Sequence, residues 1–378
     1  QVTLNSVEDT YDNLISIDGI TTSEVSMADA AVKVTSNIDK TKLDTLRGDT
    51  TGTVTVADIT EDKTDLGTIS KYGDVDLTTA NISVTGNVSK AEADTIDLYN
   101  STSGTVTLST VTDTFANIKL LHEDTSISIA SAAVTVTNAA SLANAGTLNG
   151  YTSGQVTLNS VEDTYDNLIS IDGITTSEVS MADAAVKVTS NIDKTKLDTL
   201  RGDTTGTVTV ADITEDKTDL GTISKYGDVD LTTANITVSN NVNKAEADTI
   251  DGYNSTSGTV TLTSITDTVD NVEAVRLDAT ISLASSTITV TDAASLANAT
   301  TFNSATSAQV TLNSVEDTYD NLISIDGITT SEVSMADAAV KVTSNIDKTK
   351  LDTLRGDTTG TVTVADITED KTDLGTIS

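Results

Sequence analysis

The stretch from Thr50 to Ile59 reads T-T-G-T-V-T-V-A-D-I, and it contains the pattern from which the fold can be predicted. A turn of small residues precedes Val54-Thr55-Val56, where a polar residue stands between two apolar ones. Such alternation is typical of a β-strand with one buried face. Segments of this kind recur along the whole chain, and they begin at Val2, Val32, Val54, Ile82, Val106, Val134, Val156, Val186, Val208, Ile236, Val260, Ile288, Val310, Val340 and Val362.

The chain is a tandem repeat. Residues 1–82 recur without a change as residues 155–236, and a third copy runs from 309 to 378, so the period is 154 residues. The small-residue turn divides each period into three diverged units, and the chain begins and stops inside a unit, as a window on a longer array would. We predict units at residues 1–49 (A, truncated at its start), 50–101 (B), 102–151 (C), 152–203 (A), 204–255 (B), 256–305 (C), 306–357 (A) and 358–378 (partial B).

Apolar residues at helical spacing follow each strand. After the first strand of a unit, apolar residues occupy positions i, i+4 and i+7, as in Val7, Tyr11 and Leu14. Acidic residues three positions after a polar one predict capping boxes that start these helices at Ser6, Asp58 and Thr110. A further short strand is expected in each unit, at 25–27, 75–77 and 127–129.

A strand with one short helix cannot bury its own apolar stripe, but it can do so when it stacks on a copy of itself. We therefore predict a β-rich repeat solenoid, in which a parallel β-ladder (a β-solenoid) carries short helical segments at its corners. Tandem β-sandwich domains are the alternative, because short strands with turn signals also suit a sandwich. Only 3% of the residues are aromatic, so the core must be thin and built from Val, Ile, Leu and Ala.

The composition supports a ladder and excludes several functions. The 378 residues include no proline, which lacks a backbone N–H and is excluded from the middle of hydrogen-bonded ladders. The absence of cysteine excludes disulfides and thiolate metal sites. A net charge of −36 argues against nucleic acid as a partner, since phosphate binding needs a basic surface. No apolar run is long enough to span a membrane.

One family resemblance rests on short motifs. Residues 111–118 read V-T-D-T-F-A-N-I and residues 265–272 read I-T-D-T-V-D-N-V. They resemble the V-T-D-T-x-A-N-I repeats of very large secreted bacterial surface proteins, adhesin-like and hemolysin-type, found in cyanobacteria and marine bacteria. The stretch 134–142 resembles the second half of such repeats. The resemblance implies an extracellular, repetitive, structural or adhesive role. The calcium-binding nonapeptide G-G-x-G-x-D of hemolysin-type proteins is absent here, so calcium does not carry over from it.

The sequence offers no catalytic constellation, and we predict that the protein is not an enzyme. His122 is the only histidine, so a Ser-His-Asp triad cannot recur with the repeats. The tripeptide Arg47-Gly48-Asp49 spells an integrin-binding motif, which we interpret as a turn that closes a helix, with the glycine at positive φ. Threonine pairs such as Thr53 and Thr55 suggest an ice-binding array, but lysines such as Lys33 interrupt it.

Acidic residues that recur with the period are candidate metal ligands. Their first interpretation is negative charge at a helix N-terminus. The alternative is Ca²⁺ ligation by stacked carboxylates, which would also offset the repulsion among the acidic repeats. Ca²⁺ is accordingly the one cofactor we consider, and its candidate ligands are Glu8, Asp9, Asp12, Asp74, Asp76, Glu162, Asp163, Asp166, Glu316, Asp317 and Asp320.

These observations lead to one functional expectation. We expect a secreted structural protein of the cell surface, a repetitive subunit or segment of a bacterial filament, fibre or surface layer that self-assembles. The alternative is the stalk of a large cell-surface adhesin, stabilised by calcium. The expected partners are copies of the chain itself, with a polysaccharide or the cell surface as a further candidate contact.

Overall fold

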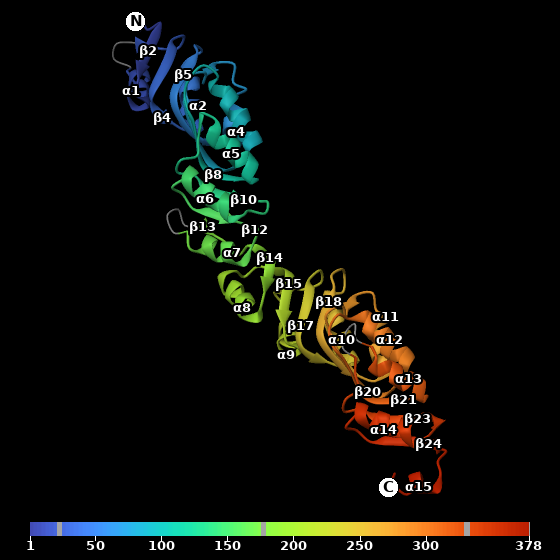
Figure 1. Ribbon diagram of the computed structural model, residues 1–378. Coiled ribbons are helices and arrows are strands. Elements are labelled where there is room, and N and C mark those ends of the chain that lie inside the picture. The colour runs from blue at the N-terminus through green and yellow to red at the C-terminus, as the bar shows by residue number, and fades with distance from the viewer. Residues whose placement is uncertain (21–24, 175–178, 329–332, 378) are drawn as a thin grey trace. The chain divides into compact units, whose positions relative to one another are not determined.

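A computed structural model describes residues 1–20, 25–174, 179–328 and 333–377 (Figure 1). The strands are β1 Val2–Thr3, β2 Ser6–Asp9, β3 Val25–Ser26, β4 Ala31–Ile38, β5 Val54–Asp62, β6 Val75–Asp76, β7 Asn81–Val88, β8 Val106–Asp113, β9 Ile127–Ser128, β10 Ala133–Val136, β11 Val156–Leu158, β12 Ser160–Asp163, β13 Val179–Ser180, β14 Ala185–Ile192, β15 Val208–Glu215, β16 Val229–Asp230, β17 Asn235–Val242, β18 Val260–Asp267, β19 Ile281–Ser282, β20 Thr287–Ala294, β21 Val310–Asp317, β22 Val333–Ser334, β23 Ala339–Ile346 and β24 Val362–Ile367. The helices are α1 Tyr11–Asp18, α2 Lys40–Asp49, α3 Lys63–Ile69, α4 Lys90–Asp97, α5 Phe115–Glu123, α6 Leu142–Tyr151, α7 Tyr165–Asp172, α8 Lys194–Asp203, α9 Lys217–Ile223, α10 Lys244–Asp251, α11 Val269–Leu277, α12 Leu296–Ala305, α13 Tyr319–Asp326, α14 Lys348–Asp357 and α15 Lys371–Leu374, with 3-10 turns η1 Leu98–Asn100 and η2 Gly252–Asn254.

The chain forms two compact units. The first contains residues 1–187 and 202–206, and the second contains residues 188–201 and 207–378. In the first unit the strands of the main sheet follow the order β2-β4-β5-β7-β8-β10-β11-β13, with the two-residue strands β6 and β9 beside β5 and β8. Strands β1 and β3 pair separately. Order along the chain and order across the sheet therefore agree, as expected when each strand stacks on the one before it.

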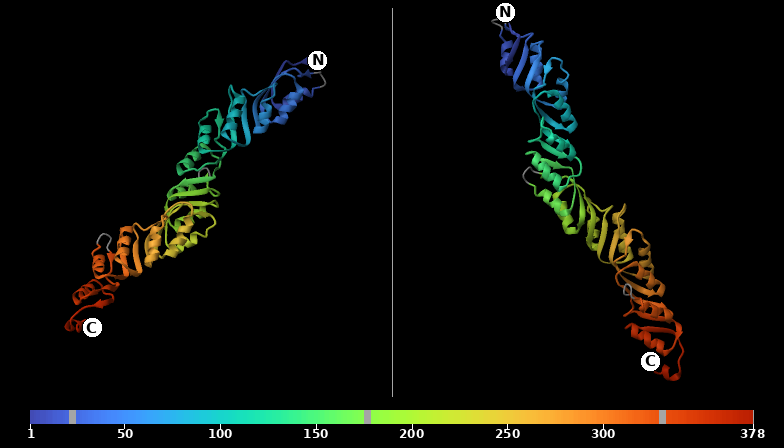
Figure 2. Two further views of the ribbon diagram at one scale, coloured as in Figure 1. Left: turned by 90° about the vertical axis from the view of Figure 1, so that its right-hand side faces the viewer. Right: turned by 45° about the horizontal axis from the view of Figure 1, so that its top comes forward.

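The second unit repeats this arrangement (Figure 2). Its strands follow the order β15-β17-β18-β20-β21-β23-β24, and β16, β19 and β22 pair with β15, β18 and β21. The strand pairs described in both units are parallel, whereas a β-sandwich is antiparallel. The predicted parallel, β-rich repeat fold is thus confirmed, with open sheets that do not close on themselves. The expected short third strands are confirmed as β3, β6 and β9.

Alternate long strands of the ladder, namely β5, β8, β15, β18 and β21, have two partners on one side. Residues of β5 pair with β4 along its length, whereas on the other edge Val54 lies beside Val75 of β6 and Ile59 lies beside Ile82 of β7. A bulge follows Val34 in β4, where the register shifts before Asn37. The same shift recurs in β7, β17, β20 and β23.

The core is a thin layer between the sheet and the helices. In β4 exposed and buried residues alternate, so one face of the sheet is buried and the other carries polar side chains in solvent. Successive parallel crossovers of the same hand place their helices on the same face of a sheet. Each helix from α1 to α14 contributes one or two buried apolar residues, for example Leu43 and Leu46 of α2 or Ala93 and Ile96 of α4. Phe302 of α12 is an aromatic exception to the expected Val, Ile, Leu and Ala core.

The helices begin later than the sequence predicted. Ser6, Asp58 and Thr110 do not cap helices, because they lie in β2, β5 and β8. The capping-box prediction at these positions is wrong for a physical reason: the second half of each strand is held by the next strand, as Val7 is by Val32. The helices α1, α3 and α5 follow N-cap residues Thr10, Asp62 and Thr114 instead.

The small-residue turns join neighbouring steps of the ladder, where a step is one long strand together with the helix that follows it. The hydroxyl of Thr50 donates a hydrogen bond to the Ala30 carbonyl (2.6 Å) and accepts one from the Gly52 N–H (3.0 Å). In the B units the buried amide of Asn100 donates to the Ala80 carbonyl (3.1 Å). Gly104 follows this turn at φ 118°, and a Cβ there would lie 2.2 Å from the Ala80 oxygen.

Replacing Gly104 by alanine should therefore destabilise the protein by about 2 kcal/mol or more, because the backbone is left-handed and the added carbon meets a carbonyl oxygen. Gly146 is the matched control. It lies inside α6 with nothing within 4 Å of an added Cβ, so Gly146→Ala should stabilise by about 0.5–1 kcal/mol. Urea unfolding of the two variants measures both effects, and equal midpoints would contradict this account of the turn.

Candidate functional site

The first group of candidate ligands, Glu8, Glu162 and Glu316, lies on the open face of the sheet. Each carboxylate forms an ion pair with the lysine of the neighbouring strand, from Lys33 to Glu8 over 2.8 Å, from Lys187 to Glu162 over 2.8 Å and from Lys341 to Glu316 over 2.7 Å. These lysines are the residues that interrupt the threonine array. Opposite charges on adjacent strands thus neutralise each other across the ladder.

The second group, Asp9, Asp163 and Asp317, accepts hydrogen bonds from backbone amides. One oxygen of Asp163 accepts from the Leu142 N–H at the start of α6 (3.0 Å), and the other accepts from the Thr164 N–H and the Asn167 side chain (both 2.8 Å). Asp317 accepts in the same way from the Leu296 N–H and the Asn321 side chain. Asp9 accepts from the Thr10 N–H and the Asn13 side chain. Asp163 therefore joins the helix before its strand to the helix after it.

The third group stands in the first turns of helices. Asp12, Asp166 and Asp320 occupy α1, α7 and α13 close to their N-termini, where negative charge complements the helix dipole. The structure does not bring these three groups together into one site. Within residues 1–20, 25–174, 179–328 and 333–377, no cluster of three or more His, Cys, Asp or Glu side chains could hold a metal ion.

Asp74 belongs to a network around Arg47. The Arg47 guanidinium makes a bidentate ion pair with Asp74, with Nε 3.0–3.1 Å and Nη2 2.9 Å from the carboxylate oxygens. The same guanidinium stacks 3.7 Å from the centre of the Tyr72 ring. The hydrogen bonds from Arg47 hold the pKa of Asp74 below its ordinary value. Arg47 of the integrin-like tripeptide is thus bound to Asp74 and Tyr72. Gly48 lies inside α2 with helical backbone, so our expectation of a positive φ at this glycine is wrong.

Two more side chains complete this network. Lys40 donates to Asp44 (2.6 Å), and the hydrogen bond to Asp44, supported by one to Tyr72, raises the pKa of Lys40 to about 12. The second unit contains the same set, with Arg201 paired to Asp228 at 2.9 Å and stacked 3.8 Å from the ring of Tyr226. Asp76, the last candidate ligand, accepts from the N–H and the hydroxyl of Thr78 within a tight turn.

The caps that join one step to the next were missed by the sequence analysis. In most of the described helices the first N–H donates to a side chain in, or just after, the strand that follows the helix. Asp113 at the end of β8 accepts from the Lys90 N–H of α4 (2.8 Å), and Ser36 in the bulge of β4 accepts from the Tyr11 N–H of α1 (3.0 Å). The other pairs, helix residue first, are Lys40 with Glu61, Phe115 with Asn138, Leu142 with Asp163, Lys194 with Glu215, Lys217 with Asn240, Lys244 with Asp267, Val269 with Asp292, Leu296 with Asp317, Tyr319 with Ser344 and Lys348 with Glu369.

A signal for these caps existed in the sequence. An acidic residue recurs at the end of every first strand, at Asp9, Glu61 and Asp113, and we assigned it to the helix that follows. The structure shows that Glu61 and Asp113 cap the preceding helix. Burial alone would raise the pKa of Asp113, but the N–H of Lys90 and the side chain of Asn117 stabilise the carboxylate, and the net effect is a lowered pKa.

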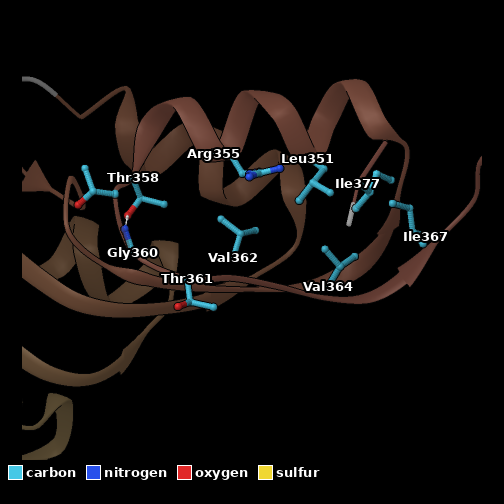
Figure 3. A pocket seen from close by; sticks show the side chains of 10 residues that line it. Leu351, Arg355, Thr358, Gly360, Thr361, Val362, Val364, Ile367 and Ile377 are labelled. Carbon is cyan, nitrogen blue, oxygen red and sulfur yellow. Dashed lines mark hydrogen bonds between the residues drawn. The ribbon is translucent and has the colours of Figure 1, made fainter. Parts of the chain in front are cut away.

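The remaining features offer little chemistry. His122 stacks on Tyr151, with ring centres 3.9 Å apart, and the next period has Arg276 in its place, paired with Glu273 at 2.6 Å. On the open face, Thr60 exchanges hydrogen bonds with the side chain of Asn37. A hollow of about 650 Å³ lies beside the last strand, β24, and its lining includes Leu351, Arg355, Val362, Val364, Ile367 and Ile377 (Figure 3).

Comparison of the chain with protein-family models and with curated proteins gives no match. Among the described residues, no helix is both long enough and apolar enough to cross a membrane. The local geometry therefore carries the functional argument.

The Arg47 network can be tested against a nearby lysine. Lys71 is exposed beside Tyr72, and among the described residues it takes part in no ion pair. Arg47→Met should lower the free energy of unfolding by about 1 kcal/mol, because it removes a partly exposed ion pair and a cation–π contact. Lys71→Met should change it little, and urea unfolding compares the two. Equal losses would show that the arginine acts through something other than Asp74 and Tyr72.

The caps predict acid sensitivity. Asp113, Asp163, Asp267 and Asp317 all have a pKa below the ordinary value of 3.8 in the folded chain. A lowered folded pKa contributes stability above the ordinary value, and this contribution disappears as the pH falls through the folded pKa. We expect the urea midpoint to drop steeply below about pH 4. In Asp113→Asn part of this drop should be absent, so a constant difference between variant and parent at all pH values would contradict the assignment.

Proposed function

We propose that this chain is a structural segment of the cell exterior, a repetitive part of a bacterial surface filament, fibre or surface layer that assembles with copies of itself. The observation that carries the proposal is the interlocking of successive steps. Each cap leaves the N-terminus of one helix dependent on the strand of the next step, so a step is complete only when another follows it. Structures of this kind gain stability by addition of like units.

The charge of the chain supports directed assembly. Its 57 acidic and 21 basic residues recur with the repeats, so negative charge is distributed along the whole chain. Like charges oppose side-by-side association of two copies. The charge therefore disfavours lateral clumping of a repetitive chain.

Analytical ultracentrifugation and negative-stain microscopy of the purified chain, at low and at high ionic strength, test this proposal. Uniform fibres at low ionic strength, which associate into lateral bundles when salt screens the acidic repeats, are the expected result. A chain that stays monomeric at high concentration would refute the assembly proposal.

A further inference from the structure

Two grooves of the same composition lie between neighbouring helices, one in each compact unit. The first, of about 300 Å³ between α3 and α4, is lined by Lys63, Thr64, Glu92, Thr95, Ile96 and Tyr99. The second, of about 440 Å³ between α9 and α10, is lined by the equivalent residues Lys217, Thr218, Glu246, Thr249, Ile250 and Tyr253, together with Asn243 and Ala245. We call them the tyrosine grooves. Neither forms part of the Arg47 network.

A buried anchor fixes the tyrosine of each groove. Tyr99 lies in the 3-10 turn η1, and the next residue, Asn100, is 5% exposed and holds the turn through its hydrogen bond to the Ala80 carbonyl. Asn254 does the same beside Tyr253, donating to the Ala234 carbonyl over 3.1 Å. The tyrosines themselves are only half-buried, so each presents part of its ring to the groove.

A glycine keeps the neighbouring helix surface bare. Gly67 and Gly221 lie inside α3 and α9, where glycine is less favourable than alanine by about 1 kcal/mol. A Cβ at Gly67 would meet nothing within 4 Å, and one at Gly221 would meet only the Tyr253 hydroxyl at 3.9 Å. Neither glycine has positive φ, so the fold does not require it. Glycine in such a place allows a ligand to approach the backbone closely.

The six lining residues that the two grooves share are identical, although nearby positions differ. Ser89 is replaced by Asn243, which lines the second groove, and Leu98 is replaced by Gly252. Tyr99 is nevertheless retained as Tyr253. Leu98, which is exposed, directly precedes Tyr99. The residue before the tyrosine therefore differs between the two copies, whereas the tyrosine itself is the same.

The rim of each groove carries balanced charge. Lys63 pairs with Glu92 over 2.7 Å, with the side chains 44% and 41% exposed, and Lys217 pairs with Glu246 over 2.8 Å. An ammonium has three donors and a carboxylate several acceptor sites, so the pair can still bond a ligand rich in hydroxyl groups. The hydroxyls of Thr95 and Thr249 donate to the carbonyls of Ala91 and Ala245 in their own helices and keep their acceptor capacity.

We propose that each tyrosine groove binds one neutral pyranose unit of a polysaccharide, with the apolar face of the sugar against Tyr99 or Tyr253 and its hydroxyls bonded to the lysine–glutamate pair and the threonine. An aromatic surface with a few convergent polar groups is the usual composition of a small-molecule site. The net charge of −36 disfavours a polyanion, and the polar lining disfavours an acyl chain. This binding goes beyond the proposed assembly and does not depend on it.

Neutral hexasaccharides of glucose, mannose and galactose are the probes, and saturation-transfer NMR with calorimetric titration measures their binding to the full chain. We expect at least one of them to bind with two sites per chain and a Kd near ~1 mM, typical of a shallow site. Tyr99→Ala should leave one site, and Tyr99→Ala combined with Tyr253→Ala should leave none. Tyr11→Ala, outside both grooves, is the matched control and should keep both sites.

A second variant separates binding from folding. Gly67→Leu combined with Gly221→Leu improves helix propensity and fills the grooves, so the thermal midpoint should hold or rise while binding is lost. Binding of none of the three sugars at about 10 mM, or binding that survives the double tyrosine variant, would overturn the proposal. Binding of an acidic polysaccharide in their place would refute the neutral ligand. Fibre formation is scored separately, so loss of one property leaves the other measurable.

Discussion

The fold depends on one interaction, the hydrogen bond from the first N–H of a helix to a side chain of the strand that follows it. A helix leaves its first backbone N–H groups without intrahelical partners. In most proteins the residue just before the helix satisfies them, and here Asp39 and Ser89 also do so. The bond from the next strand adds a constraint between steps: Asp113 can reach the Lys90 N–H only when β7 and β8 are paired in the observed register. Local capping and long-range register thus stabilise each other.

This constraint accounts for much of the composition. Every first strand must end in a side chain that accepts hydrogen bonds, and a carboxylate is the strongest acceptor available. Acidic residues therefore recur, and few basic residues oppose them. The close approach of turns such as Gly104 to Ala80 requires small residues between steps, and the thin core leaves little room for aromatic rings. Proline would remove donors from a ladder in which almost every strand has neighbours on both sides.

The sequence predicted the strands well because a one-sided sheet imposes strict alternation, and even the two-residue strand at Val75 was visible in it. The start of the helices was harder to predict. Val7 and Tyr11 have helical spacing, yet Val7 is held in β2 by its pairing with Val32, and no local pattern reports such a partner. Spacing likewise located the acidic residues but not their partners. Asp74 looked like a free oxygen ligand, whereas Arg47, 27 residues away along the chain, binds it.

The caps between steps also define how the length of such a chain can change. The A, B and C units each end their first strand with an acidic side chain, as in Glu61, Asp113 and Asp163. Deletion of residues 50–101 would bring Asp113 to the place of Glu61, opposite the Lys40 N–H, and α2 would still have an acceptor. Loss of half a unit would leave a helix facing the wrong half of a strand. Recombination between the identical copies can thus lengthen or shorten the array in whole units, and the folded state itself selects against intermediate lengths.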